Sequence, residues 1–153
     1  MNINKAIWGN IIWILFHTLA EKLKDEHINE LPVLLNHIIL ICNNLPCPDC
    51  QTHAMTFLKN INKNAVSASK NTLIEFLWTF HNNVNARIKK PIFTKESLAK
   101  YKTANTAQIV KQFILIMKNV KNNNNSLMHG FHRTFYINKF SEYIYANTHK
   151  YNT

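Results

Sequence analysis

Two cysteines, Cys47 and Cys50, have the residue type and spacing that most directly indicate chemistry in this sequence. They lie in residues 45–54, LPCPDCQTHA, and the Cys-x-x-Cys spacing allows a tight disulfide at the first turn of a helix. Pro48 suits the first helical position, where its missing N–H costs nothing. Cys47 would then lie at the N-cap, where free N–H groups and the helix dipole favour a thiolate. We therefore predict a reactive dithiol or disulfide at a helix start.

Two other interpretations of the cysteine pair stay open at this point. A Cys-x-x-Cys pair is often half of a zinc site, but the only other cysteine is Cys42. His129 and His132 could complete a two-cysteine, two-histidine set, although their spacing is shorter than such sites usually show. The pair could also be inert and buried. A second motif helps to choose between these interpretations.

The second motif is residues 78–89, WTFHNNVNARIK, in an expected helix over about 73–89. A helical wheel at about 100° per residue separates two stripes. One is apolar: Leu73, Leu77, Phe80, Val84 and Ile88. The other carries an indole, an imidazole, two amides and an ammonium group: Trp78, His81, Asn82, Asn85 and Lys89. A ligand with a flat ring, several hydrogen-bonding atoms and a phosphate would match the second stripe.

Helices are expected almost throughout the chain, which predicts an all-α fold. Helical periodicity covers about 5–24, 27–44, 48–61, 73–89, 95–101 and 105–120, and an aromatic tail over 127–147 should add one or two helices. Residues 62–71 are expected to form a loop, with Asn71 or Thr72 capping the next helix. The polar run 122–125 is expected to be a linker.

Composition limits the possible classes of protein. The 153 residues are 46% hydrophobic, enough for one core, and no apolar run is long enough to span a membrane. The apolar run at 7–20 lacks the features of a signal peptide, so the default compartment is the cytosol. The net charge of +10 is scattered except at Arg87, Lys89 and Lys90. We therefore expect a phosphate-bearing cofactor near that cluster and no nucleic-acid function.

Taken together, the motifs resemble the FAD-linked sulfhydryl oxidases of the Erv/ALR type. The resemblance rests on Cys47–His53, on Trp78, His81-Asn82 and Val84-Asn85, and on Trp8-Gly9 with Trp13 and His17 in the first helix. It spans residues 1 to about 103. The spelling Leu-Pro-Cys-Pro looks most like the versions encoded by large cytoplasmic DNA viruses.

The resemblance implies a fold and a reaction. Residues 1–103 would form a four-helix bundle with a short fifth helix, which binds FAD at the end of the bundle and usually forms a homodimer. Residues 104–153 would be a helical C-terminal extension of unknown role. Protein thiols would become disulfides while O2 becomes H2O2. The alternative is a non-catalytic helical module for binding or assembly that keeps this fold.

The resemblance also assigns roles to residues. Cys50 would be the sulfur beside the flavin, and Cys47 would exchange with the substrate thiol. No metal is expected. The implied cofactor-binding residues are Trp8, Trp13, His17, His53, Trp78, His81, Asn82 and Asn85, with Lys89 or Lys90 facing phosphate.

One departure from the longer family members affects the expected partners. Those members carry a second cysteine pair that shuttles electrons, whereas Cys42 is alone here and expected to be buried. A protein thiol must therefore reach Cys47 directly, or a separate protein such as a thioredoxin-like carrier must act as the shuttle. A viral setting would place the protein in the cytoplasm of the host cell, with packaging in a virion as a further option.

Overall fold

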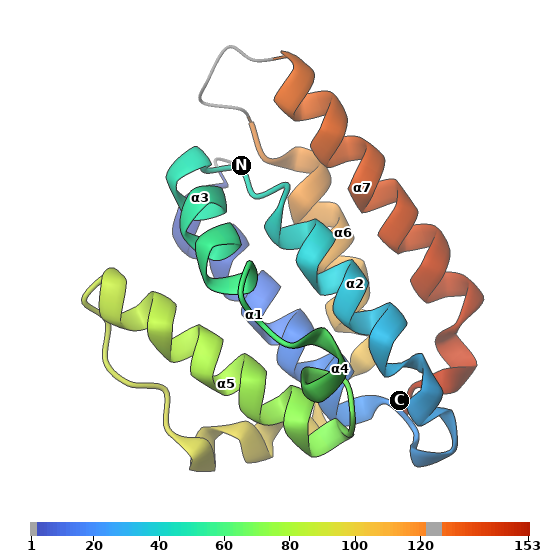
Figure 1. Cartoon of the computed structure of the whole chain (residues 1–153). Coiled ribbons are helices and arrows are strands. Elements are labelled where there is room, and N and C mark those ends of the chain that lie inside the picture. The colour runs from blue at the N-terminus through green and yellow to red at the C-terminus, as the bar shows by residue number, and fades with distance from the viewer. Residues whose placement is uncertain (1–2, 122–126) are drawn as a thin grey trace.

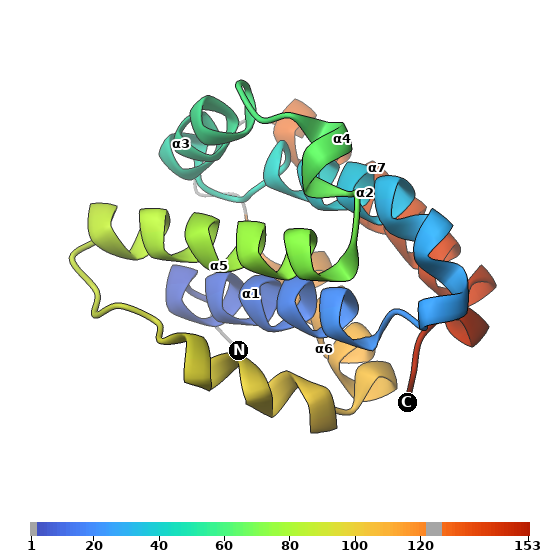
Figure 2. The ribbon, with the colours of Figure 1, turned by 60° about the horizontal axis from the view of Figure 1, so that its bottom comes forward.

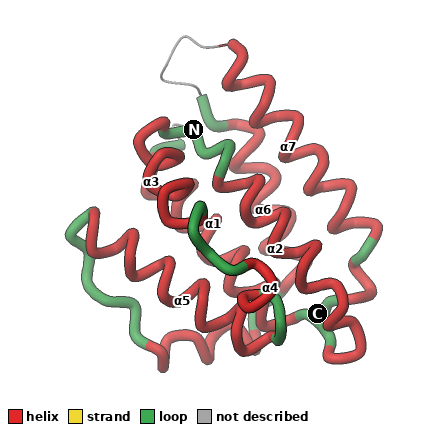
Figure 3. The backbone as a smooth tube through the Cα atoms, viewed as in Figure 1, coloured by secondary structure: helices red, strands yellow, loops and turns green. Residues whose placement is uncertain are grey.

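Helix α1, Lys5–Lys22, lies at the centre of the fold and is buried along most of its length. The computed structural model describes residues 3–121 and 127–153, and in these ranges it contains helices and no strand (Figure 1, Figure 3). The all-α prediction is therefore confirmed. Among these residues, no helix is both long and apolar enough to cross a membrane.

The other elements follow in chain order around α1. They are η1 (Asp25–Glu30), α2 (Leu31–Cys42), α3 (Pro48–Leu58), α4 (Lys63–Val66), α5 (Lys70–Arg87), η2 (Lys95–Thr103), α6 (Thr106–Asn119), α7 (Leu127–Ala146) and η3 (Thr148–Lys150). In Figure 2, α5 runs alongside α1, with η2 on the other side of α1. The expected linker at 122–125 lies outside the described residues.

Helix starts follow from local chemistry. The Asn4 side chain accepts a hydrogen bond from the backbone N–H of Ile7, which caps α1. Helix α5 begins one turn earlier than expected because Ser69 and Thr72 form a capping box. The expected cap at Asn71 or Thr72 was therefore wrong. The expected loop over 62–71 also contains the short helix α4, which Asn62 caps.

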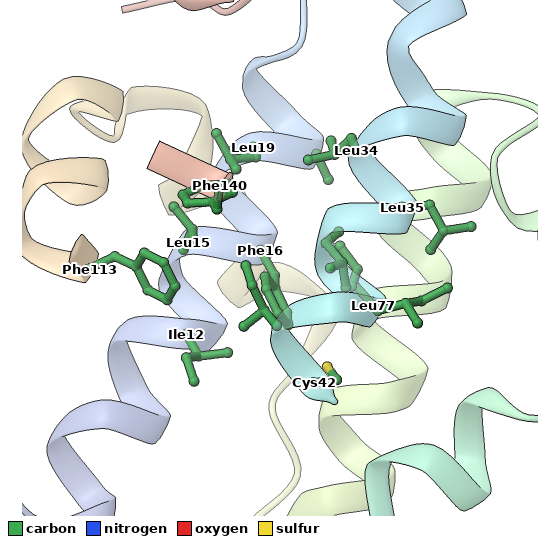
Figure 4. Close-up of a cluster of buried hydrophobic side chains, with 14 of the residues drawn as sticks. Ile12, Leu15, Phe16, Leu19, Leu34, Leu35, Cys42, Leu77, Phe113 and Phe140 are labelled. Atoms are coloured by element: carbon green, nitrogen blue, oxygen red, sulfur yellow. The ribbon is translucent and has the colours of Figure 1, made fainter. Parts of the chain in front are cut away.

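The core is one continuous hydrophobic cluster that all the longer helices share. Figure 4 shows side chains from α1, α2, α5, α6 and α7 meeting around Phe16, which is almost fully buried. Large side chains of this kind each stabilise the fold by roughly 1.5–3 kcal/mol when fully buried. The same cluster includes Phe113 of α6 and Phe140 of α7, so the C-terminal extension shares a core with residues 1–103.

The extension covers two helices of the N-terminal part. Helix α6 packs along α1, and α7 packs on α2 and α6. The buried Arg133 side chain donates a hydrogen bond to the carbonyl of Val120, which ties α7 to the end of α6. At the other end, Lys150 pairs with Glu30 over 2.7 Å. The first contact therefore ties the two helices of the extension together, and the second fixes its C-terminal end to the bundle.

Candidate active site

The cysteine pair lies at the start of α3, as the spacing predicted. Cys47 is the N-cap, Pro48 occupies the first turn, and a disulfide joins Cys47 to Cys50. The backbone N–H of Cys50 donates to the Cys47 sulfur over 3.2 Å. Such donors stabilise negative charge on sulfur at a helix N-terminus. The local geometry therefore favours a reactive thiolate at Cys47 once the disulfide is reduced.

A cavity of about 650 Å³ opens on the inner side of this disulfide. It lies among α1, the end of α2, α3, α5, the segment 88–93 and η2. Cys50 lines the cavity, whereas Cys47 does not. Pro48 and Asp49, next to Cys47, are exposed to solvent. Cys50 therefore faces the cavity and Cys47 lies outside its lining, while both residues are half-buried.

Seven of the residues singled out in the sequence line the cavity together. They come from α1, α3, α5 and the segment after α5: Trp8, Trp13, Cys50, His53, His81, Asn85 and Lys90. The remaining ones, Cys47, His17, Trp78, Asn82 and Lys89, lie outside the lining. A direct contact between these outer residues and a cofactor stays a prediction.

A stack of flat rings forms one wall of the cavity. The rings of Trp13 and His81 lie 4.2 Å apart at an interplanar angle of 5°. Behind them, His17 Nε2 and His81 Nδ1 share a hydrogen bond of 2.9 Å. His17 also stacks on Phe93 and Tyr101. This wall offers a rigid flat surface against which a ring system can stack.

Both histidines of the stack are neutral at pH 7. Burial lowers the pKa of His17 to about 3, with the neighbouring His81 and Lys100 adding to the shift. Burial and the nearby Lys100 and Lys90 lower the pKa of His81 to about 4. Because the pair shares one proton in its hydrogen bond, one ring donates and the other accepts.

Trp78 and Asn82 anchor the segment that closes the cavity. The Trp78 indole N–H donates to the carbonyl of Phe93 over 2.7 Å. The Asn82 amide both donates to that carbonyl and accepts from the N–H of Phe93, at 3.0 and 2.8 Å. Phe93 in turn stacks on His81. These two side chains of α5 therefore position the wall of the cavity from behind.

The end of α5 distinguishes Lys89 from Lys90. Lys89 has φ 58°, the only positive φ among the non-glycine residues described. The N–H groups of Lys89 and Lys90 donate to the carbonyls of Ala86 and Asn85, which is a Schellman arrangement with lysine where glycine is usual. Lys90 lines the cavity, and Lys89 is outside it. Of the two, Lys90 is placed to meet an anionic group.

The cavity is strongly basic. Lys5, Arg87, Lys90 and Lys100 line it, and no carboxylate is among the lining residues described. Asn85 is buried, and its side-chain amide has no hydrogen-bond partner in the described part of the chain. The amide opens on the cavity and is not enclosed by protein, since Thr18 Oγ1 is the only buried side-chain polar atom without a partner among the described residues, so the Asn85 amide is available to bond a polar ligand. These features suit a ligand with flat rings and phosphates.

Several of these residues were not identified from the sequence. Lys5, Lys100, Phe93 and Tyr101 reach the cavity from α1, the segment after α5 and η2. The Nε2–H of His53 on α3 donates a 2.9 Å hydrogen bond to Oδ1 of Asn83 on α5, which fixes the imidazole ring. Only Arg87 had a signal, its place in the basic cluster. The others depend on the packing of helices distant in sequence.

Gly9 leaves space in the wall contributed by α1. It lines the cavity, and a Cβ built at this position would meet no atom within 4 Å. Glycine inside a helix costs roughly 0.5–1 kcal/mol relative to alanine. Close packing by neighbouring protein atoms therefore does not explain a glycine at this position. The space it leaves is available to a ligand.

The residues described offer no metal site. No group of three or more His, Cys, Asp or Glu side chains is arranged to hold an ion in residues 3–121 and 127–153. His129 lies near Gln51, with their side-chain nitrogens 3.5 Å apart, and does not join a cysteine cluster. The zinc interpretation therefore has no supporting geometry within these residues.

Comparison with known proteins agrees with this geometry. The profile of the Erv1 / Alr family matches residues 10–106. Protein 096R of Invertebrate iridescent virus 3, named as a candidate FAD-linked sulfhydryl oxidase, is 36% identical over 92 residues, which cover 60% of this chain and 62% of 096R. An African swine fever virus protein named FAD-linked sulfhydryl oxidase is 32% identical over 111 residues, covering 68% of this chain and 84% of its own length.

A plant protein is also similar to this chain. The FAD-linked sulfhydryl oxidase ERV1 of Oryza sativa subsp. japonica is 33% identical over 87 residues, covering 56% of this chain and 43% of its own length. No solved structure gave a match. The segment that the family profile matches, residues 10–106, contains the disulfide, the ring stack and Lys90. On this evidence the chain belongs to the Erv1 / Alr family.

Proposed function

We propose that the protein is an FAD-dependent thiol oxidase that forms disulfides in protein substrates. The observation that carries this proposal is that Cys50, one half of a disulfide, lines the same basic, aromatic cavity as the Trp13–His81 stack. A redox pair in the wall of a cofactor-sized cavity can pass electrons to a bound ring. Family membership and the names of the relatives support the same reaction.

The residues present fit FAD on three independent features. Trp13 and His81 offer a flat surface for a ring, as adenine or isoalloxazine requires. Lys5, Arg87, Lys90 and Lys100 would neutralise the diphosphate. The Asn85 amide, which has no partner in the described protein, could donate and accept hydrogen bonds with a ring edge. FAD, when bound, would accept the electron pair of a dithiol and pass it to O2, giving H2O2.

The disulfide would act first at Cys47. A substrate thiolate attacks the Cys47 sulfur, the Cys47–Cys50 bond breaks, and Cys50 leaves as a thiolate on the cavity side. The second substrate thiolate then attacks the mixed disulfide and releases Cys47. The substrate loses two electrons and two protons, and the cysteine pair gains them. Cys47 is the sulfur proposed to meet the substrate because it lies outside the lining of the cavity, whereas Cys50 lines it.

The uncharged His17–His81 pair would keep the ring stack of the cavity wall in place during turnover. His17 and His81 carry no charge at pH 7 because burial and nearby lysines lower both pKa values. His81 is itself stacked between Trp13 and Phe93, and an uncharged His81 supports these rings without adding a further positive charge to the wall. The lysines and Arg87 remain the charged groups that face phosphate. The neutral rings would thus serve for stacking, and the lysines and Arg87 would neutralise the phosphate charge.

The proposals on substrate, carrier, compartment, oligomeric state and individual site residues rest on family resemblance. We propose a protein dithiol as substrate, a thioredoxin-like carrier as one form of it, and the cytoplasm of an infected host cell as the setting, with virion packaging as a further option. A homodimer also stays a proposal. The assignments of Trp8, Trp13, His17, His53, Trp78, His81, Asn82, Asn85 and Lys90 to cofactor binding are likewise proposals, with Lys90 chosen over Lys89 as the residue that meets phosphate.

The direct test is the visible absorbance of the purified, FAD-loaded protein before and after a dithiol is added in air. An oxidase loses the absorbance of oxidised flavin, consumes O2 and recovers the absorbance when the dithiol is exhausted. A protein that does not bind FAD, or that binds it without O2 consumption, would be the alternative, a non-catalytic binding or assembly module.

Two lysine variants sharpen the cofactor assignment. Lys90→Ala should weaken FAD binding about tenfold or more, because a charge-assisted contact with phosphate is lost. Lys89→Ala is the matched control, with the same change of charge one residue outside the cavity. Equal effects of both variants would argue against a phosphate contact at Lys90.

Gly9→Leu should weaken FAD binding while leaving the helix folded, because it fills open space.

A further inference from the structure

An apolar face of α7 has no partner in the described structure. Leu127, Met128, Phe131 and Phe135 are 81, 69, 72 and 55% exposed. They lie within the first turns of the helix, at a spacing that puts them on one side. We call these four side chains the α7 patch. Contiguous exposed apolar residues of this kind commonly mark a site of protein interaction.

The α7 patch begins beside the outer side of the disulfide. Gln51, which follows Cys50, brings its Nε2 within 3.5 Å of Nδ1 of His129 in the first turn of α7. The same Gln51 side chain donates to the carbonyl of Leu45, and its backbone N–H donates to the carbonyl of Cys47. Figures 1 and 2 both show the start of α7 at the end of the molecule that holds α3.

A shallow groove continues this surface along α3. It has a volume of about 330 Å³ and is lined by Gln51, Thr52, Met55, Thr56 and Lys59. These residues lie on a different face of α3 from Cys50, His53 and Ala54, which line the large cavity. Helix α3 therefore presents one face inward to the cavity and another outward to the groove, with the disulfide at the end where both begin.

Charge indicates which kind of partner fits. Of the six lysine and arginine residues in 104–153, Arg133 is buried and Lys150 pairs with Glu30 at the other end of the extension, so the cations that the described contacts place at this surface are Lys139 and, from α3, Lys59. At the edge of the patch, Lys139 lies with its Nζ 5.4 Å from the centre of the Phe135 ring. Lys59 closes the far end of the groove. Basic side chains around an apolar centre favour a partner whose apolar residues are bordered by carboxylates.

We propose that the α7 patch and the α3 groove dock the protein that donates electrons to Cys47, and that this donor carries its two cysteines in an apolar segment bordered by acidic side chains. The proposal rests on the function proposed above. Docking would bring a donor thiolate to the Cys47 sulfur. The donor then leaves as a disulfide, and the Cys47–Cys50 pair is left reduced. The C-terminal extension would thus serve as a substrate-recognition element.

The test compares two variants on the same helix. Phe131→Ser removes an aromatic side chain from the patch, and Tyr145→Ser removes another exposed one from the other end of α7, about 21 Å away. The substrates are a reduced Cys-x-x-Cys peptide with apolar residues flanked by glutamates, the same peptide with lysines in place of glutamates, and dithiothreitol.

The proposal predicts a selective effect. Phe131→Ser should raise KM for the acidic peptide about tenfold, as for loss of an aromatic anchor, while oxidation of dithiothreitol is unchanged. Tyr145→Ser should change neither. The wild type should prefer the acidic peptide over the basic one, and added salt should reduce that preference.

Three results would overturn the proposal. The first is an equal effect of Phe131→Ser on peptide and dithiothreitol, and the second is no effect on either. The third is a wild-type dimer, detected by light scattering, that Phe131→Ser dissociates, because the patch would then bind a second copy. Failure of the proposed function itself is distinguishable: the wild type would not oxidise dithiothreitol, whereas binding of a labelled acidic peptide with serines for cysteines could still be measured.

Discussion

The end of α2 and the start of α3 each carry a cysteine, and the fold gives the two sulfurs opposite chemistry. Cys42 is the last residue of α2 and is 2% exposed. Burial raises the pKa of its thiol to about 12. Cys47, five residues later, is the N-cap of α3 and accepts an N–H from Cys50. Helix ends and burial, rather than nearness in sequence, decide which sulfur reacts.

Proximity to the cavity does not explain the difference either. Cys42 and Cys50 both line the large cavity. Cys42 sits at a helix C-terminus, where the helix dipole disfavours a thiolate, and Cys50 lies in the first turn of a helix, where it favours one. The comparison therefore predicts that Cys42 packs the core beside the cavity and does not exchange with substrate. Each of the following variants tests one side of it.

The largest expected effect is on the α3 side. Cys50→Ser and Cys47→Ser should each lower the rate of O2 consumption with dithiothreitol by about a thousandfold or more, because the covalent step needs both sulfurs. Cys42→Val is the control and should turn over at the wild-type rate. A Cys42→Val enzyme as slow as Cys50→Ser would remove the distinction between the two helix ends.

Alkylation should separate the sulfurs next. After reduction at pH 7.5, iodoacetamide should modify Cys47 at least about a hundredfold faster than Cys42, because the thiolate fraction and access both differ. Peptide mass mapping at timed intervals gives the rates. Adding denaturant should equalise them. Comparable rates in the native protein would mean that Cys42 is not sequestered.

Substitution of Cys42, at the end of α2, should change the free energy of unfolding. Cys42→Ser should lower the free energy of unfolding by about 1–3 kcal/mol, since it places a hydroxyl in an apolar site without a partner. Cys42→Val should cost less than about 1.5 kcal/mol because volume and polarity are nearly kept. Denaturant titration of the three proteins checks the order. Serine as stable as valine would imply that Cys42 is hydrated.

The burial of Cys42 should also make the stability of the fold depend on pH. The Cys42 pKa rises from 9.0 to about 12 on folding, so the folded state keeps a proton that the unfolded state releases between these values. Its contribution is complete below pH 9 and is lost as the pH rises toward 12, by up to about 1.4 kcal/mol per pH unit. Unfolding of Cys42→Val between pH 8 and 10.5 should therefore be less steeply pH-dependent than that of the wild type.

Local signals in the sequence predicted the reactive end well. Pro48 at the first helical position and Cys47 at the N-cap depend on residues within one turn, and the structure confirms both. The burial of Cys42 also followed from helical periodicity. These features depend only on neighbours in sequence. They did not require knowledge of how the helices pack.

Longer-range features could not be predicted in the same way. The helical wheel put Trp78 and Asn82 on one stripe with His81, but their polar atoms bind the backbone of Phe93 instead of lining the cavity. The choice between Lys89 and Lys90 depended on a positive φ at Lys89, which no residue type in the sequence required. The contribution of η2 to the site depended on its packing against α1.

The most direct test of the account is anaerobic mixing of the FAD-loaded protein with dithiothreitol, followed by the visible absorbance of flavin. The account predicts that the wild type and Cys42→Val lose this absorbance rapidly, whereas Cys50→Ser keeps it on the same timescale. Loss of the absorbance in Cys50→Ser at the wild-type rate would show that electrons reach the cofactor without the α3 disulfide, and would contradict the account.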